Sequence, residues 1–125
     1  MKAFNNILAY SLAELGRAEG ETGRLAVAIA GDKGTAKSVA SALVNEVGFD
    51  PVDAGGLQES WRQQPATPAY CCDFDAGQTR EALSAAKPGV APAIRDRMME
   101  NYSKLPANAT HAEMVAMNRV VNVAP

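Results

Sequence analysis

Residues 31–38 (Gly-Asp-Lys-Gly-Thr-Ala-Lys-Ser) are of types that bind phosphate groups in many proteins. They follow an apolar run and open a helical pattern, where free backbone N–H groups attract anions. The phosphate loop of nucleotide hydrolases needs four residues between its glycines and a lysine directly after the second. Here two residues separate Gly31 from Gly34, and Lys37 follows three positions later. A tight turn with a capped helix is therefore the favoured interpretation, and a phosphate site is the alternative.

The sequence contains no Gly-x-Gly-x-x-Gly motif. Dinucleotide-binding sheets hold the pyrophosphate of their cofactor on that turn. The chain alone is therefore predicted not to bind a dinucleotide tightly.

Candidates for acid–base or nucleophilic chemistry are few, and each has a structural alternative. Asp53 is expected at a strand end, where it could orient a ligand, although a solvated turn aspartate is favoured. His111 could be a general base, but the helix-capping pattern around it favours an exposed helix-start residue. Cys71 and Cys72 are adjacent, which disfavours a disulfide between them and favours packing over nucleophilic work. With one histidine and no Cys-x-x-Cys pair, we expect no metal site, and we assign no catalytic residue.

Trp61 and Arg62 lie in the most unusual segment, beside two glutamines and a proline. Tryptophan and arginine are favoured at contact surfaces because they bury much area and still offer hydrogen-bond donors. The single tryptophan can equally anchor a small core. Ligand or interface contact and core packing therefore stay open as alternatives.

Hydrophobic periodicity predicts a strand, a helix and a strand over residues 25–55. The apolar run 25–30 suits a strand covered on both faces. The helix that follows is expected to take Asp32 or Thr35 as its N-cap and to end at Gly48. Its apolar stripe, expected to face the core, consists of Val39, Leu43, Val44 and Val47.

The second strand of this unit covers residues 51–54, and one more short strand is expected over residues 2–6, followed by a helix over about 6–15. The fold class is therefore α/β, with a partial, Rossmann-like sheet of three strands. Residues 1–56 form this α/β part of a single domain that spans 1–125.

The remaining part, residues 57–125, is expected to be mostly helical. Three long helices are expected there. Asp73 or Asp75 is expected to cap the first, a proline is expected in the first turn of the second, and a Thr-x-x-Glu capping box is expected to begin the third. The expected helices cover residues 75–86, 92–105 and 110–122, after one or two helical turns over 57–62.

Composition excludes several classes of partner. The net charge of -2 argues against nucleic acid and against a polybasic membrane contact. No apolar run approaches the roughly 20 residues that span a bilayer, and no signal peptide is recognisable. The adjacent cysteines indicate a reducing, cytoplasmic location.

Several sequence runs stand in a characteristic order along most of the chain. They are residues 2–6 (KAFNN), 23–25 leading to 30–32, 48–55, 59–65 followed by 67–68 and 70–71, and 116–119. Each run alone is weakly specific. In this order and spacing they resemble the C-terminal part of the deazaflavin (coenzyme F-420)-dependent NADP oxidoreductase family.

The resemblance implies that residues 2–6 are the last strand of an NADP-binding sheet whose glycine-rich, N-terminal half comes earlier. This chain starts at that strand, so we expect it to lack that half, through a truncated gene, a misplaced start codon or survival as a free-standing remnant. By the same resemblance Asn5, Asn6, Asp53 and Gly55 are cofactor-binding residues on the nicotinamide side of the cleft. Trp61 and Arg62 are the implied contacts to the substrate or second cofactor.

The implied reaction is hydride transfer between NADP and a deazaflavin, in which the cofactors carry the chemistry and the protein positions them. The expected function is thus that of a C-terminal fragment of an NADP-dependent oxidoreductase, inactive alone and without a tightly bound cofactor. The alternative is a non-enzymatic oligomerisation or interaction module derived from that fold. Because a cut sheet edge is a liability, we expect a homo-oligomer in which a second copy covers residues 1–6 or the helical tail. A small-molecule substrate is the other expected partner.

Overall fold

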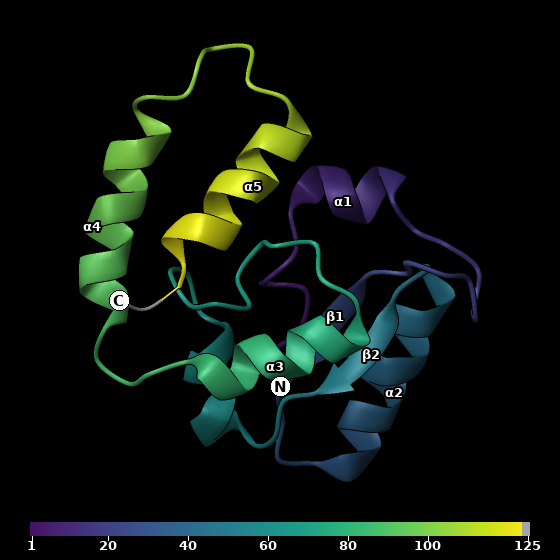
Figure 1. Cartoon of the computed structure of the whole chain (residues 1–125). Coiled ribbons are helices and arrows are strands. Elements are labelled where there is room, and N and C mark those ends of the chain that lie inside the picture. The colour runs from purple at the N-terminus through teal and green to yellow at the C-terminus, as the bar shows by residue number, and fades with distance from the viewer. Residues whose placement is uncertain (124–125) are drawn as a thin grey trace.

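Two parallel strands form the sheet in the computed structural model, which describes residues 1–123 (Figure 1). Strand β1 (Ala26–Ile29) pairs with β2 (Asp50–Asp53), and helix α2 (Gly34–Glu46) connects them. The register runs from Ala26 opposite Asp50 to Ile29 opposite Asp53. This unit confirms the predicted strand–helix–strand order and the α/β class.

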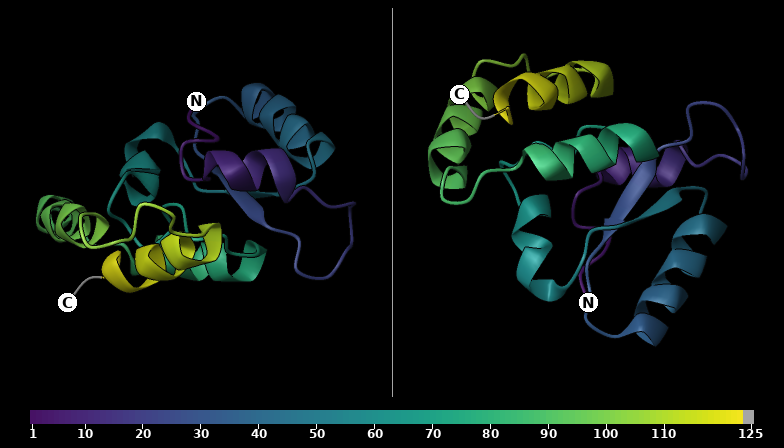
Figure 2. Two further views of the ribbon diagram at one scale, coloured as in Figure 1. Left: turned by 90° about the horizontal axis from the view of Figure 1, so that it is seen from above. Right: turned by 60° about the horizontal axis from the view of Figure 1, so that its bottom comes forward.

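The sheet is covered on both faces, as its apolar sequence predicts (Figure 2). Successive strand residues point to opposite faces. Val27 and Ile29 therefore pack with α2, together with Phe49, in one fully buried cluster. Ala28 and Val52 face the other way and pack against helix α3 (Ala76–Ala85).

The expected third strand over residues 2–6 is wrong, because only Lys2 joins the sheet. It forms an isolated antiparallel bridge with Ala30, with N···O distances of 2.7 and 2.9 Å. Phe4 has a φ of 60°, which turns the backbone out of the extended region that a ladder needs. The next backbone groups pair elsewhere, since the carbonyl of Asn6 accepts from the N–H of Cys71.

The first helix is also shorter than expected, with α1 covering only Ala9–Glu14. The side-chain amide of Asn6 donates to the carbonyl of Ala69, which holds the chain in a bend before the helix. Ser11 is the fully buried residue of α1.

The start and end of α2 differ in how well the sequence predicts them. Neither Asp32 nor Thr35 is the N-cap, which is Lys33 without a side-chain cap. Asp32 instead accepts from the backbone N–H of Leu57 at 2.9 Å. The left-handed end at Gly48 is confirmed, with a φ of 99°.

The predicted core stripe of α2 is largely wrong. Val44 is fully buried, and Ala40 lies beside it on the inner face. Val39, Leu43 and Val47 are exposed, by 70%, 47% and 40%. A narrow two-stranded sheet contacts only one side of α2, so about half of the apolar residues of the helix remain exposed to solvent.

The C-terminal half is helical as predicted. The 3₁₀ helix η1 (Leu57–Gln63) leads through a loop to α3, and α4 (Ala91–Tyr102) and α5 (His111–Val121) then pack on each other (Figure 1). Capping boxes at Asp75 and Thr110 begin α3 and α5, and a proline lies in the first turn of α4.

A third apolar cluster holds this half together, and it joins Ile94 and Met98 of α4 to Val121 of α5 and Ala66. On α5, Val115 is buried, whereas Val120 is 75% exposed. None of the helices within residues 1–123 has both the length and the apolar character needed to cross a membrane.

Candidate functional site

Two hollows adjoin at the carboxyl ends of the strands, and both are lined by Asp53. One, of about 550 Å³, lies between β2, η1 and α3, and the other, of about 590 Å³, lies between β1 and α2. Ligands of open α/β sheets gather at this edge. The first hollow is lined by Asp53, Ala54, Arg62, Arg80, Leu83 and Ser84.

The second hollow is lined largely by residues of the stretch 31–38. Gly31, Gly34, Lys37 and Ser38 all line it. The loop is folded back on the chain after β2, because the N–H of Gly31 donates to the carbonyl of Gly55 at 2.9 Å. The phosphate interpretation of this stretch stays a prediction.

Asp53, which lines both hollows, forms an ion pair with Lys37, which lines the second. Their side chains meet at 2.6 Å, with the Asp53 side chain 66% exposed. The hydrogen bond from Lys37 lowers the pKa of Asp53, and the backbone N–H of Gly55 lowers it further. Asp53 is therefore ionised at neutral pH, which suits it to hold a cation or to orient a hydroxyl or amide.

Gly55, the next predicted site residue, shapes the turn beside Asp53. Its φ of 86° is in the left-handed region that favours glycine. Its carbonyl accepts from Gly31 and, at 3.4 Å, from Lys37. The structure thus brings Asp53 and Gly55 together as predicted, although contact with a cofactor stays a prediction.

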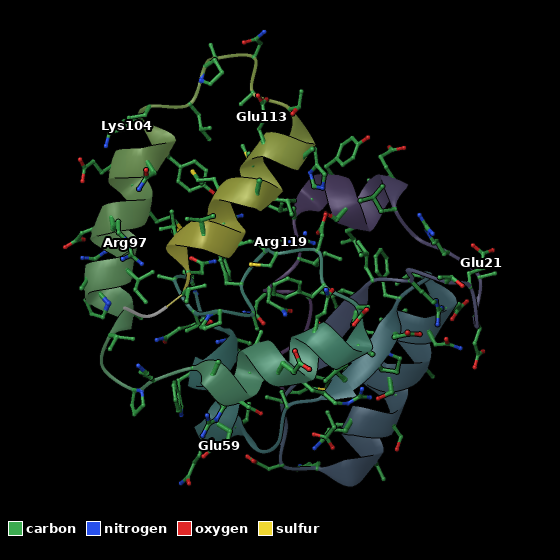
Figure 3. The ribbon with its side chains drawn as sticks, in the orientation of Figure 1. Glu21, Glu59, Arg97, Lys104, Glu113 and Arg119 are labelled. Atoms are coloured by element: carbon green, nitrogen blue, oxygen red, sulfur yellow. The ribbon has the colours of Figure 1, made fainter. Side chains whose placement is uncertain are left out.

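Arg62 reaches the first hollow from η1, and Trp61 supports it. The guanidinium lies 4.5 Å from the centre of the half-buried Trp61 ring. It is also 2.7 Å from the carboxylate of Glu59, which is labelled in Figure 3. A stacked arginine keeps its charge and has a restricted position, which favours binding of an anion.

Arg80 is the member of this site that sequence reasoning missed. It enters the hollow from α3, and within residues 1–123 no carboxylate lies at ion-pair distance from it. The sequence did contain a signal for this residue, since Arg80 is the only basic residue of α3. Placing it required knowing that α3 packs across both strands.

Asn5 and Asn6 line neither of these two hollows. Asn5 pairs with Gln63 through both its amide atoms, at 2.6 Å to the backbone carbonyl and 2.8 Å to the side-chain amide. Asn6 is 6% exposed and binds Ala69. These contacts fix the N-terminal segment on the loop after η1, and the predicted role of the two residues beside a nicotinamide stays a prediction.

A second polar cluster joins three distant parts of the chain. The Asp73 carboxylate accepts from the Ser11 hydroxyl at 2.7 Å, and its other oxygen lies 2.6 Å from Nε2 of His111. The prediction that His111 is an exposed helix-start residue is thus wrong, since the side chain is 22% exposed and stacks on Tyr10. Its helix position is as predicted, directly after the Thr110 cap.

Serine, histidine and aspartate together invite comparison with a hydrolase triad. In a triad the serine and the aspartate bind opposite nitrogens of the imidazole. Here Ser11 lies 3.3 Å from the same Nε2 atom that meets Asp73, and Ser11 is fully buried. The cluster therefore has neither the geometry nor the access for nucleophilic catalysis, and it ties α1 to α5.

The loop that carries Asp73 is strained and held by α5. Cys71 and Asp73 have φ values of 55° and 49°, which are unfavourable for residues with a side chain. Asn118 donates to the carbonyl of Cys71. Arg119, which is labelled on α5 in Figure 3, donates to the carbonyls of Cys72 and Asp73. The hydrogen bonds from these α5 side chains thus offset the backbone strain of the loop.

The two thiols of this loop are buried and free, as expected for packing. Burial raises the pKa of Cys71 and of Cys72 to about 11. Both are therefore protonated and unreactive at neutral pH. Within the described residues no group of three histidine, cysteine or acidic side chains is placed to hold a metal ion.

Comparison with known proteins shows a clear similarity to a bacterial protein. The chain is 46% identical over 104 residues to the Escherichia coli (strain K12) protein named "Putative protein YjhV", and the match covers 83% of this chain and 76% of that protein. No protein-family model matches the chain, and no solved structure matches it significantly. Identity at this level over most of both sequences shows common descent, and the chain belongs to the same family as YjhV.

Proposed function

We propose that the chain is the C-terminal part of an NADP-dependent oxidoreductase, deazaflavin-linked as in the family it resembles, and forms one side of the ligand site. The hollow beside Asp53 receives anionic groups of NADP or of the second cofactor. Hydride transfer needs the two rings to be positioned and the surrounding charges to be fixed, and no acid or base need come from this chain.

The convergence of Arg62 and Arg80 on one hollow at the end of β2 is the observation that supports this proposal. Arginine binds phosphate and carboxylate oxygens through paired N–H groups. Arg62 already has a partner in Glu59, whereas Arg80, among the residues that the structure describes, donates only to the backbone carbonyl of Ala76 in its own helix. Arg80 is therefore the cation with most capacity for an external anion.

The hollow also explains why binding by this chain alone is expected to be weak. It is open to solvent on one side, and the sequence has no glycine-rich pyrophosphate turn. The half-buried Arg62 and the exposed Arg80, without such a turn, give an affinity in the roughly millimolar range. The chain alone is expected to produce no turnover of NADPH with a deazaflavin.

Nuclear magnetic resonance of the ¹⁵N-labelled chain can test the proposal, because it detects millimolar binding. Titration with NADPH, with a deazaflavin and with inorganic pyrophosphate is expected to shift backbone signals of residues 53–62 and 80–84. Fluorescence of Trp61, the only tryptophan, is expected to change in parallel, because its ring contacts Arg62.

Substitution of Arg80 supplies the decisive comparison. Arg80→Gln is expected to weaken binding of each anion about tenfold, because a charge-assisted hydrogen bond is lost. The matched control is Arg95→Gln on α4, where Arg95 pairs with Asp96 outside the hollow. Shifts that map elsewhere, or that are the same in both variants, would refute the anion site.

We also propose a cytoplasmic location, because two buried cysteines without a disulfide suit a reducing compartment. A non-enzymatic interaction module remains the second candidate function. The exposed apolar side chains of α2 favour it, and they make a separate prediction.

A further inference from the structure

The outer face of α2 is apolar and nearly free of charge. Figure 2 shows the helix at the periphery, with no other helix against its outer side. Val39 and Leu43 are 70% and 47% exposed there. The exposed residues of the helix itself are Gly34, Thr35, Ser38, Val39, Ala42, Leu43 and Glu46.

Such a face is unusual for a helix in contact with water. Solvated helix faces normally carry charges of both signs, whereas the centres of protein interfaces are depleted of them. Glu46 is the one charge among these residues, and it lies at the C-terminal end. Lys37 does not contribute, because it turns to Asp53 at 2.6 Å.

We propose that this face binds a second copy of the chain, with the two α2 helices antiparallel about a two-fold axis. In that arrangement Val39 of one copy lies opposite Ala42 of the other, and Leu43 lies opposite Ser38. Each large side chain thus meets a small one, which lets the two helices pack closely. The same register brings Glu46 of one copy beside Thr35 of its partner.

Electrostatics favours the antiparallel direction. The N-terminus of α2 has no side-chain cap and no acidic residue in its first turn, so its backbone N–H groups are open to an anion. Glu46 sits at the unfavourable, C-terminal end of its own helix dipole. Pairing places its carboxylate at the favourable end of the partner helix, close to Lys33, which makes no ion pair within residues 1–123.

The pattern suits a second copy of the chain related by a two-fold axis, because the same face then supplies both halves of each contact. The large and small residues, and the opposite charges, are arranged symmetrically about the midpoint between Val39 and Ala42. The contact area of one helix face is small, so we expect weak, concentration-dependent association. The α2 face is proposed beside residues 1–6 and the helical tail, whose contact with a second copy stays a prediction.

Sedimentation-velocity measurements on the whole chain test the pairing. Between about 10 µM and 1 mM the wild-type protein is expected to move from monomer toward dimer. Val39→Glu, which buries a carboxylate in each half of the interface, is expected to raise the dimer dissociation constant at least tenfold. Val120→Glu is the matched control, because Val120 is an equally exposed valine on another helix.

A charge exchange tests the direction of the helices. Glu46→Lys is expected to weaken an antiparallel dimer, because it puts a cation at the partner's positive helix end. In a parallel dimer the same change replaces two facing carboxylates by two facing ammonium groups, so the repulsion persists and the dissociation constant is expected to change little. Adding Lys33→Glu to Glu46→Lys is expected to restore part of the association. A wild-type chain that stays monomeric to about 1 mM, or equal loss with both valine variants, overturns the proposal.

Discussion

Asp73 and His111, 38 positions apart in the sequence, meet with 2.6 Å between Oδ2 and Nε2. Asp73 belongs to the strained loop after η1, and His111 is the first residue of α5. The Asp73 side chain is 8% exposed and also accepts from the buried Ser11. This contact therefore joins α1, the strained loop and the C-terminal helix pair at one point.

Replacement of His111 tests whether this contact stabilises the fold. His111→Ala is expected to lower the free energy of unfolding by about 1–3 kcal/mol, because it leaves a buried carboxylate oxygen without its partner. Urea denaturation followed by circular dichroism measures the change. Lys104→Ala, which breaks an exposed pair with Glu100, is the control and should cost under about 1 kcal/mol. A similar small loss in both variants would contradict the assigned role.

Asn118 is expected to be the most sensitive residue of the α5 contact. It is fully buried, donates to the carbonyl of Cys71 and accepts from the hydroxyl of Tyr102 at 3.2 Å. Asn118→Leu keeps the size but leaves both partners unpaired, so we expect a loss of about 2–4 kcal/mol. Tyr102→Phe removes one of these bonds and should cost less. Equal stability of Asn118→Leu and wild type would show that the loop does not need the bond.

Whether a feature could be predicted depends on how far apart in the sequence the interacting residues lie. The caps at Asp75 and Thr110 and the left-handed turn at Gly48 were predictable, because they depend on residues within one turn of helix. The partners of His111 and Asn6 were not, because they come from loops 38 and 63 residues away. Local patterns contain no information about such pairings.

Periodicity also predicts an apolar face without saying what covers it. The stripe at Val39, Leu43 and Val44 was correctly identified as apolar, yet only Val44 is buried. In the candidate site, Asp53 was proposed from its place at a strand end, whereas Gly55 and Arg62 were proposed from the family resemblance, and ligand contact by all three stays a prediction. Arg80 was missed because its contribution depends on how α3 crosses the sheet.

The two buried thiols give the fold a pH dependence in alkaline solution. Their pKa rises from 9.0 to about 11 in the folded chain, so between these values the unfolded chain releases thiol protons that the folded chain keeps. Stability is therefore complete below pH 9 and falls as pH rises toward 11. Burial also raises the pKa of Tyr70 and of Tyr102, which adds a loss of the same sign at higher pH.

Urea titrations at about pH 8 and about pH 10 measure this effect. The double variant Cys71→Ala, Cys72→Ala is expected to show a smaller drop in stability between the two pH values than wild type. Alkylation by iodoacetamide in native buffer should be slow at both thiols and fast after unfolding. An unchanged pH dependence in the double variant would assign the loss to other groups.

Arg24 is expected to be essential for the edge of the sheet. It is 3% exposed, bonds Asp50 and the Asn45 side chain at 2.7 Å each, and also binds the carbonyl of Arg17. Arg24→Met preserves its apolar stem but leaves several acceptors unpaired, so a loss of about 3 kcal/mol is expected. Arg95→Met, at an exposed pair, is the control. Thermal melts of both variants should separate clearly, and overlapping curves would rule out the predicted role.

Gly48 allows a close backbone approach between the end of α2 and the loop after α1. Its φ is 99°, and an added Cβ would lie 2.7 Å from the Cα of Gly16 and 2.8 Å from the N of Arg17. Arg17 N–H donates to the Gly48 carbonyl at 2.9 Å, so the loop cannot move away without losing that bond.

Gly48→Ala is therefore expected to cost about 3 kcal/mol or more, from backbone strain and the clash together. Gly20 is the matched control, because its φ of 82° imposes the same kind of strain but nothing lies within 4 Å of its added Cβ. Gly20→Ala should cost only about 1 kcal/mol. The difference between the two variants isolates the contact with Gly16, and equal losses would mean that left-handed strain alone determines the role of Gly48.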